Sequence, residues 1–176
     1  MSSDYGLNFG FRRSDESVLN REGRQKVPVT GTFRLGTLVM FDTASAGYVK
    51  AATANAVGEG GTVGLLVQEE IWDRSIYAPS RIDSFYYGVA RNNRLAIIAS
   101  GAGAKVWFKN TAAQTRADGR TLAAVTMVDL TTGAPGVLDY LAWDGTRFVK
   151  GTGVSDSMLR ITLTNGTDYC EAVLTR

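Results

Sequence analysis

The sequence predicts an all-β protein, because short apolar runs and glycine-rich turns alternate along it. Residues 38–41 read Leu-Val-Met-Phe between Gly36 and Asp42, and residues 63–67 form a second run that ends at Gln68. A helix needs about 10–12 residues with 3.6-residue periodicity, so runs of this length favour strands. The chain contains 20 glycines and 3 prolines, and the glycines separate the apolar runs, as the turns of an all-β fold require.

Residues 1–27 are expected to form an extended arm ahead of a body that spans residues 28–176. Apolar residues alternate with small or polar ones, which is the period-two pattern of a strand, and two arginines follow; these residues are Tyr5, Leu7, Phe9, Phe11, Arg12 and Arg13. The rest of the arm is mixed in charge and poor in apolar residues. Two interpretations remain open: the arm adds a strand to another protein's sheet, or it is an N-terminal strand of this chain's own sheet.

The energetics of such an arm limit how tightly it can bind on its own. Burying four large apolar side chains stabilises by roughly 1.5–3 kcal/mol each. Ordering eight residues costs about 1–2 kcal/mol each in backbone entropy, which nearly cancels this gain. A lone arm would therefore bind weakly, unless main-chain hydrogen bonds help or several arms act together through an oligomer.

In the first half of the body, strands are expected near residues 38–41, 47–52 and 63–67. Residues 51–57 have no apolar stripe that could anchor a helix, so we expect a loop there. Two apolar segments at 84–90 and 94–99 flank Asn92-Asn93 and predict a hairpin, since asparagine tolerates positive φ.

The second half of the body is expected to add more strands. Residues 105–109 and 121–129 read as single strands. Asp144-Gly145 and Asn165-Gly166 each separate two alternating apolar runs, which is the strongest local signal for a hairpin. In the last strand, Cys170 shares a face with two apolar residues, so it is expected in the core rather than as a reactive thiol; the face comprises Cys170, Ala172 and Leu174.

Residues 71–80 are aromatic, contain a proline and lack clear alternation, which indicates a long loop or an edge segment. Two interpretations of Trp72 and Tyr77 stay open. They pack as a lid on the core, or they lie in an oligomer interface, where aromatic residues are enriched.

The composition argues against catalysis. The chain has no histidine, the commonest general base and metal ligand, and one cysteine, so an internal disulfide is excluded. No pair of carboxylates stands out among the candidates Glu69, Glu70, Asp73, Asp83, Asp139 and Asp144. We therefore expect no enzyme, no cofactor, no metal and no small-molecule substrate. A net charge of +2 with mixed signs gives no reason for a nucleic-acid partner, and no apolar run is long enough to span a membrane.

The order of these elements resembles the head decoration, or capsid cement, proteins of tailed bacteriophages, the group typified by the phage lambda decoration protein. The resemblance covers residues 31–111. It is carried by the runs Gly-Thr-Leu-Val-Met-Phe-Asp at 36–42, Tyr-Val-Lys-Ala-Ala at 48–52, Gly-Thr-Val-Gly-Leu-Leu-Val at 61–67 and Gly-Val-Ala at 88–90, and by the small-residue turn before Lys105-Val106.

This resemblance implies a small, β-tulip-like β-barrel that forms a homotrimer on the outside of an expanded capsid. It also implies that the arm pairs with the major capsid protein, and that the chain is made in the host cytoplasm and ends in the virion. Residues 118–176 depart from the shorter members of the family. These C-terminal β-hairpins extend the barrel, add a second β layer or form a separate unit.

Two other function classes remain open. One is another phage structural subunit, such as a tail-tube or head–tail connector protein, which would form rings of six or more copies. The other is a binding module for sugar or single-stranded nucleic acid, which would need an exposed stacking platform. The residues for such a platform are Trp72, Trp107 and Trp143, although their apolar surroundings favour core packing.

Overall fold

The fold is all-β, as predicted. The computed structural model describes residues 9–11, 24–54, 57, 62–69, 89–90, 92–93, 95–99, 102–115, 117, 119 and 121–175, and within these ranges it contains strands and turns but no helix. No helix in this part of the chain therefore meets the length and hydropathy needed to span a membrane.

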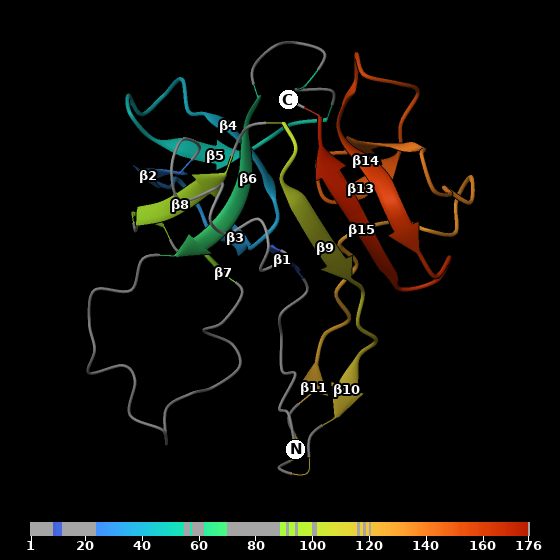
Figure 1. Cartoon of the computed structure of the whole chain (residues 1–176). Coiled ribbons are helices and arrows are strands. Elements are labelled where there is room, and N and C mark those ends of the chain that lie inside the picture. Colours follow the sequence, from blue (N-terminus) through green and yellow to red (C-terminus); the bar gives the residue numbers. More distant parts are fainter. Residues whose placement is uncertain are drawn as a thin grey trace.

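The first half of the body forms a five-stranded antiparallel sheet in the order β2-β8-β6-β4-β5 (Figure 1). Its strands are β2 (Arg24–Pro28), β4 (Leu38–Phe41), β5 (Val49–Ala51), β6 (Thr62–Glu69) and β8 (Leu95–Ala99). The predicted strands at 38–41, 47–52 and 63–67 are confirmed. Pro28 ends β2, which is an edge strand, a position where proline is tolerated.

A second antiparallel sheet has six strands in the order β1-β9-β15-β14-β12-β13. They are β1 (Phe9–Phe11), β9 (Lys105–Lys109), β12 (Tyr140–Trp143), β13 (Phe148–Lys150), β14 (Ser157–Thr164) and β15 (Tyr169–Leu174). Both predicted hairpins, β12–β13 and β14–β15, are confirmed, and Gly145 and Gly166 adopt the positive φ values of 104° and 74° that their turns require. Strands β9 and β15 pair directly, so the C-terminal hairpins share a sheet with residues 105–109.

The hairpin predicted around Asn92-Asn93 is wrong. Asn93 does have a positive φ of 61°, but β7 (Val89–Ala90) pairs with β3 (Phe33–Arg34), whereas β8 pairs with β2 and β6. The turn at Asn92-Asn93 is present as expected. The chain after it enters a different sheet, because the strands that pair with β8 are distant in the sequence.

The strand predicted at 121–129 is also wrong beyond its first two residues. Strand β11 (Thr121–Leu122) pairs with β10 (Gln114–Thr115), and single bridges then join Val125 to Thr111 and Val128 to Phe148. Asn110 supplies the reason: its Oδ1 accepts from the Met127 and Val128 amides at 2.8 and 3.2 Å, and its Nδ2 donates to the Val128 carbonyl at 2.6 Å. The side chain thus replaces ladder bonds and frees the segment from regular pairing.

The main core lies between the two sheets (Figure 1). Leu38 and Leu65 of the five-stranded sheet belong to the same buried cluster as Phe108, Leu141 and Phe148 of the six-stranded sheet. Each sheet order ends in two distinct edge strands, so the described strands do not close into a barrel. The sheets are joined through their inner faces.

Candidate interaction surfaces

The residues predicted to contact a partner lie mostly outside the described part of the chain. This holds for Tyr5, Leu7, Arg12, Arg13, Trp72 and Tyr77. The other two, Phe9 and Phe11, begin and end β1.

Strand β1 lies on the edge of the six-stranded sheet, where it pairs with β9. Phe9 is opposite Phe108, Gly10 opposite Trp107 and Phe11 opposite Val106. This arrangement corresponds to the second interpretation of the arm, an N-terminal strand of the chain's own sheet. A three-residue ladder is short, and an aromatic residue opposite an edge glycine is a known means of stabilising such a position.

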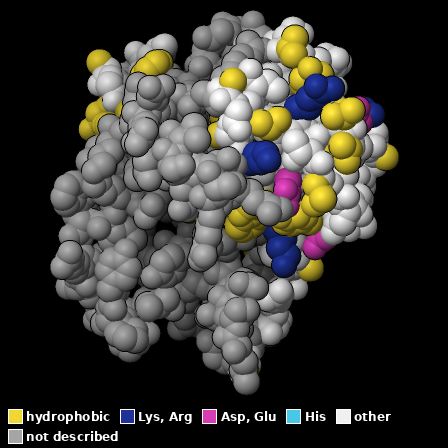
Figure 2. Space-filling model, in the orientation of Figure 1, with side chains coloured by type: hydrophobic (Ala, Val, Ile, Leu, Met, Phe, Trp, Pro, Cys, Tyr) yellow, Lys and Arg dark blue, Asp and Glu magenta, His cyan; other side chains and the backbone are white. Residues whose placement is uncertain are grey.

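The outer face of the six-stranded sheet combines aromatic and basic residues. Strand β9 buries Val106 and Phe108 and turns Lys105, Trp107 and Lys109 outward. The Arg160 guanidinium lies 5.4 Å from the centre of the Tyr140 ring, within the range of a cation–π contact. Figure 2 shows hydrophobic side chains interspersed with side chains of both charges, Lys and Arg as well as Asp and Glu, on the side of the molecule where β13, β14 and β15 lie.

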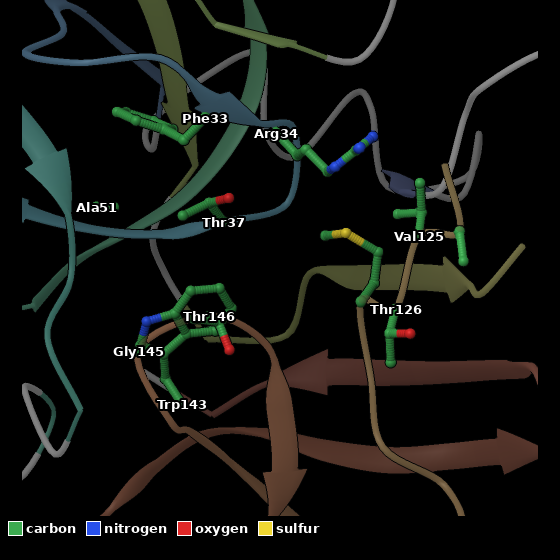
Figure 3. A pocket seen from close by; sticks show the side chains of 11 residues that line it. Phe33, Arg34, Thr37, Ala51, Val125, Thr126, Trp143, Gly145 and Thr146 are labelled. Atoms are coloured by element: carbon green, nitrogen blue, oxygen red, sulfur yellow. The ribbon is translucent and has the colours of Figure 1, made fainter. Parts of the chain in front are cut away.

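A pocket of about 280 Å³ opens where the two sheets meet, and we call it the inter-sheet pocket (Figure 3). Its wall combines apolar, hydroxyl and cationic side chains from four segments: Phe33, Arg34 and Thr37, then Ala51, then residues 124–127, then Trp143, Gly145 and Thr146. Figure 3 shows Arg34 and Thr37 facing Trp143 and Val125 across the opening. The pocket therefore offers an apolar floor and one positive charge.

The loop at residues 131–139 presents two large apolar side chains to solvent. Val137 and Leu138 are 55% and 60% exposed, and Leu138 has a φ of 77°, an unfavourable conformation for a leucine. Three bonds hold it there: the Leu138 amide donates to the Ile161 carbonyl at 2.9 Å, Arg160 Nε donates to the Leu138 carbonyl at 2.9 Å, and the Ile161 amide donates to the Asp139 carbonyl at 2.9 Å. The loop is thus a fixed apolar projection.

Carboxylates in the described residues support turns. Burial opposes ionisation of Asp156, but hydrogen bonds from Ser157, Thr152 and Gly153 lower its pKa to about 2. Hydrogen bonds from Thr132 and Thr131 hold the pKa of Asp129 far below its usual value, and Arg147 lies 3.3 Å away. At Asp139, the Gly136 amide and Lys150 lower the pKa in the same direction.

The predictions for the cysteine, the tryptophans and a metal site can be compared with the structure. Cys170 is fully buried, as predicted, and burial raises the pKa of its thiol to about 12. Trp143 lies in the core, with Nε1 donating to the Ala52 carbonyl at 2.9 Å, so it cannot serve as a stacking platform. Trp107 is half-buried, and Trp72 is not described. No group of three or more potential metal ligands occurs among the described residues.

The comparisons with known proteins leave the family open, because no family model and no curated protein matches the sequence significantly. The inter-sheet pocket and the exposed apolar pair Val137 and Leu138 were not predicted from the sequence, which indicated only a turn at residues 132–136. The pocket is assembled from four distant segments, and nothing in the local sequence marks Leu138 as a residue with positive φ. The unbroken pair Val137-Leu138 after the Thr-Gly-Ala-Pro-Gly turn was the one available signal.

Proposed function

We propose that this chain is a structural virion protein that binds the outside of an expanded phage capsid as a trimer. In this role it bridges subunits of the major capsid protein and stabilises the shell, and residues 1–13 add to a capsid sheet. A β-tulip-like arrangement similar to that of the resembling family is part of this proposal, with the two open sheets and their common core as its body.

The observation that carries the proposal is the position of β1. It is a three-residue strand at the edge of a sheet, it contains two of the predicted arm residues, and β9 is its one strand partner within the described residues. Between β1 and the next described residue, Arg24, lie twelve residues, enough chain for β1 to leave β9 while the body stays in place. Release from β9 would free the arm for the capsid.

The body is built to fold without this strand. Among the residues whose side chains the structure describes, the buried clusters lie between Val27 and Leu174, and β9 has a five-residue pairing with β15 that does not involve β1. An edge strand of three residues adds little to such a sheet. A truncated chain should therefore retain its structure.

Co-sedimentation with phage shells tests the proposal. The full chain should bind mature, expanded shells saturably and leave unexpanded procapsids in the supernatant. A chain without residues 2–13 should melt as a folded protein and fail to bind the shells. Failure of the full chain to bind either shell would overturn the proposal, and a solution ring of six or more copies would then favour a tail-tube or connector subunit.

A further inference from the structure

We propose that the inter-sheet pocket binds a small organic acid, with the acid's apolar group between the two sheets and its carboxylate at Arg34 and Thr37. This binding site goes beyond the proposed function, since it needs neither a capsid nor the arm. The acid is a bound ligand rather than a substrate, because the described side chains that line the pocket include no general base.

Arg34 and Thr37 are the two ends of one tight turn in the pocket wall. The Thr37 amide donates to the Arg34 carbonyl at 3.2 Å, and Gly36 inside the turn has a φ of 82°, which glycine adopts readily. The turn leads directly into β4, whose first two residues, Leu38 and Val39, are fully buried. The turn is thus anchored in the core, and it places Arg34 and Thr37 on the same side of the pocket (Figure 3).

The Thr37 hydroxyl is a polar group that the fold leaves without a partner. Thr37 is only 6% exposed, it lines the pocket, and its hydroxyl makes no hydrogen bond to any described residue. Unpaired polar groups at buried positions are costly, and most of them find a partner in the protein, in water or in a ligand. Figure 3 shows the Thr37 oxygen turned toward the side on which Arg34 lies, so one acceptor group in the pocket can bind both.

Arg34 makes the pocket suited to an anion. Its guanidinium has no ion-pair partner among the described residues, and no carboxylate lines the pocket. Asp144 adjoins the pocket by accepting from the Thr146 hydroxyl at 2.9 Å, but Arg147 lies 3.4 Å from this carboxylate and compensates its charge. The negative charge of Asp144 is therefore no obstacle to an anion at Arg34.

The single cation favours a carboxylate over a phosphate. A carboxylate carries one negative charge and matches the planar guanidinium with two parallel hydrogen bonds. A phosphate group carries a charge of about −1.5 to −2, so part of its charge would stay uncompensated beside apolar walls.

The apolar walls define the other half of the ligand. The Nε1 of Trp143 is engaged by the Ala52 carbonyl, so the indole contributes apolar surface to the pocket. Phe33, Val125 and Met127 complete these walls, and a methionine adapts readily to the shape of its neighbour. The volume of about 280 Å³ is nearly twice that of a cavity of roughly 150 Å³ that holds benzene. An aromatic ring with a short acidic chain therefore fits.

Titration with 3-phenylpropionate and with its uncharged amide tests the site, because the two compounds share the same ring and chain. Heteronuclear NMR follows the indole N–H of Trp143 and the amides of residues 34–37, with the indole N–H of Trp107 on the outer face as the internal control. The acid should shift the pocket signals saturably, with a dissociation constant of about 1 mM or below, which a ligand of this size can reach. The amide should bind at least about 10-fold more weakly, since it lacks the charge.

The same chemistry occurs in a free acid and at the C-terminus of a polypeptide. N-Acetylphenylalanine has the ring and the carboxylate of such a chain end. If it binds as tightly as 3-phenylpropionate, the pocket accepts a chain end, and weaker binding identifies the free acid as the ligand.

Two conservative variants assign the affinity to named side chains. Arg34→Gln removes the charge and should raise the dissociation constant at least about 10-fold, whereas Thr37→Val removes the hydroxyl and should raise it about 3–10-fold. Thr37→Val should melt no lower than the wild type, because it removes an unpaired polar group. Arg160→Gln, which removes an arginine from the outer face of the other sheet, should bind the acid like the wild type.

Several results would overturn the inference. These are an absence of saturable shifts, equal affinities for the acid and the amide, and an Arg34→Gln variant that binds like the wild type. Shifts at Trp107 as large as those at Trp143 would also overturn it, because the acid would then bind outside the pocket. None of these results bears on the co-sedimentation assay, so this site and the proposed function fail or stand separately.

Discussion

Trp143 connects the two sheets directly. Its indole is 3% exposed, its Nε1 donates to the Ala52 carbonyl across the core, and its ring lies 4.9 Å from that of Phe148. Trp143→Phe keeps most of the apolar volume but leaves that carbonyl unpaired in the core. We expect a loss of about 2–4 kcal/mol in the free energy of unfolding, measured by urea denaturation with far-UV circular dichroism.

The half-buried Trp107 provides the matched control for this measurement. Trp107→Phe lies on the outer face of the same sheet and should cost less than about 1 kcal/mol. Equal losses for the two variants would mean that the inter-sheet hydrogen bond adds nothing to stability.

Asp156 gives the turn before β14 a defined pH dependence. Its pKa is about 2 in the folded chain, against 3.8 for an unperturbed aspartate, so the folded state prefers the ionised form. The resulting stability is complete above pH 4 and is lost as the pH falls from about 4 to 2. Asp156→Asn should cost about 1–2 kcal/mol at pH 7, a value reduced for partial exposure, and almost nothing at pH 2. Denaturant titrations of the wild type and of Asp156→Asn at pH 7 and pH 2 test this prediction. If the difference in their free energies of unfolding is the same at both pH values, the charge of the Asp156 carboxylate is not its source.

At the scale of elements, Gly151 allows the chain to pass close beside β14 as it leaves β13. A Cβ atom there would overlap Ser157 Oγ and lie 3.1 Å from the Ala142 amide nitrogen and from Asp156 Oδ1. Ser157 is fully buried and hydrogen-bonded to Asp156 at 2.6 Å, so it cannot move aside easily. Gly151→Ala should therefore destabilise by about 2–3 kcal/mol.

Gly153 is the control for this overlap, because a Cβ there meets no atom within 4 Å. Gly153→Ala should change the free energy of unfolding by less than about 0.5 kcal/mol. Removing the obstructing hydroxyl with Ser157→Ala should make the Gly151→Ala substitution less costly than in the wild-type background. Additive losses would show that Ser157 is not the obstacle.

The elements that the sequence predicts well are those that local chemistry determines. Asp144-Gly145 and Asn165-Gly166 specify their turns within four residues, and the hairpins around them form as expected. The prediction of a hairpin at Asn92-Asn93 failed because β8 pairs with β2 and β6, and a local turn does not specify these partners. The strand at 121–129 failed because Asn110, more than ten residues away, satisfies its backbone.

At the scale of the whole molecule, the candidate sites were the hardest to predict. The inter-sheet pocket depends on how two sheets meet, which no window of sequence contains. The exposed projection depends on a leucine with positive φ, which is set by Ile161 and Arg160 on a neighbouring strand. The arm was predictable as an alternating apolar pattern, but the pattern alone could not distinguish a partner's sheet from this chain's own.

The core that the two sheets share also determines whether they unfold together or separately. Leu38, Ala52 and Leu65 belong to the same buried cluster as Phe108, Phe148 and Ile161, so neither sheet keeps its inner face covered once the other has opened. We expect one cooperative thermal transition, in which the calorimetric enthalpy equals the van't Hoff enthalpy. In hydrogen exchange, the most protected amides of both sheets should show the same free energy of opening, that of global unfolding. Two resolved transitions, with protection surviving in residues 140–174 after residues 24–99 have opened, would instead show that the C-terminal hairpins form an independent unit. Because the inner faces of both sheets bury their largest side chains against each other, a single transition is the outcome that the packing requires.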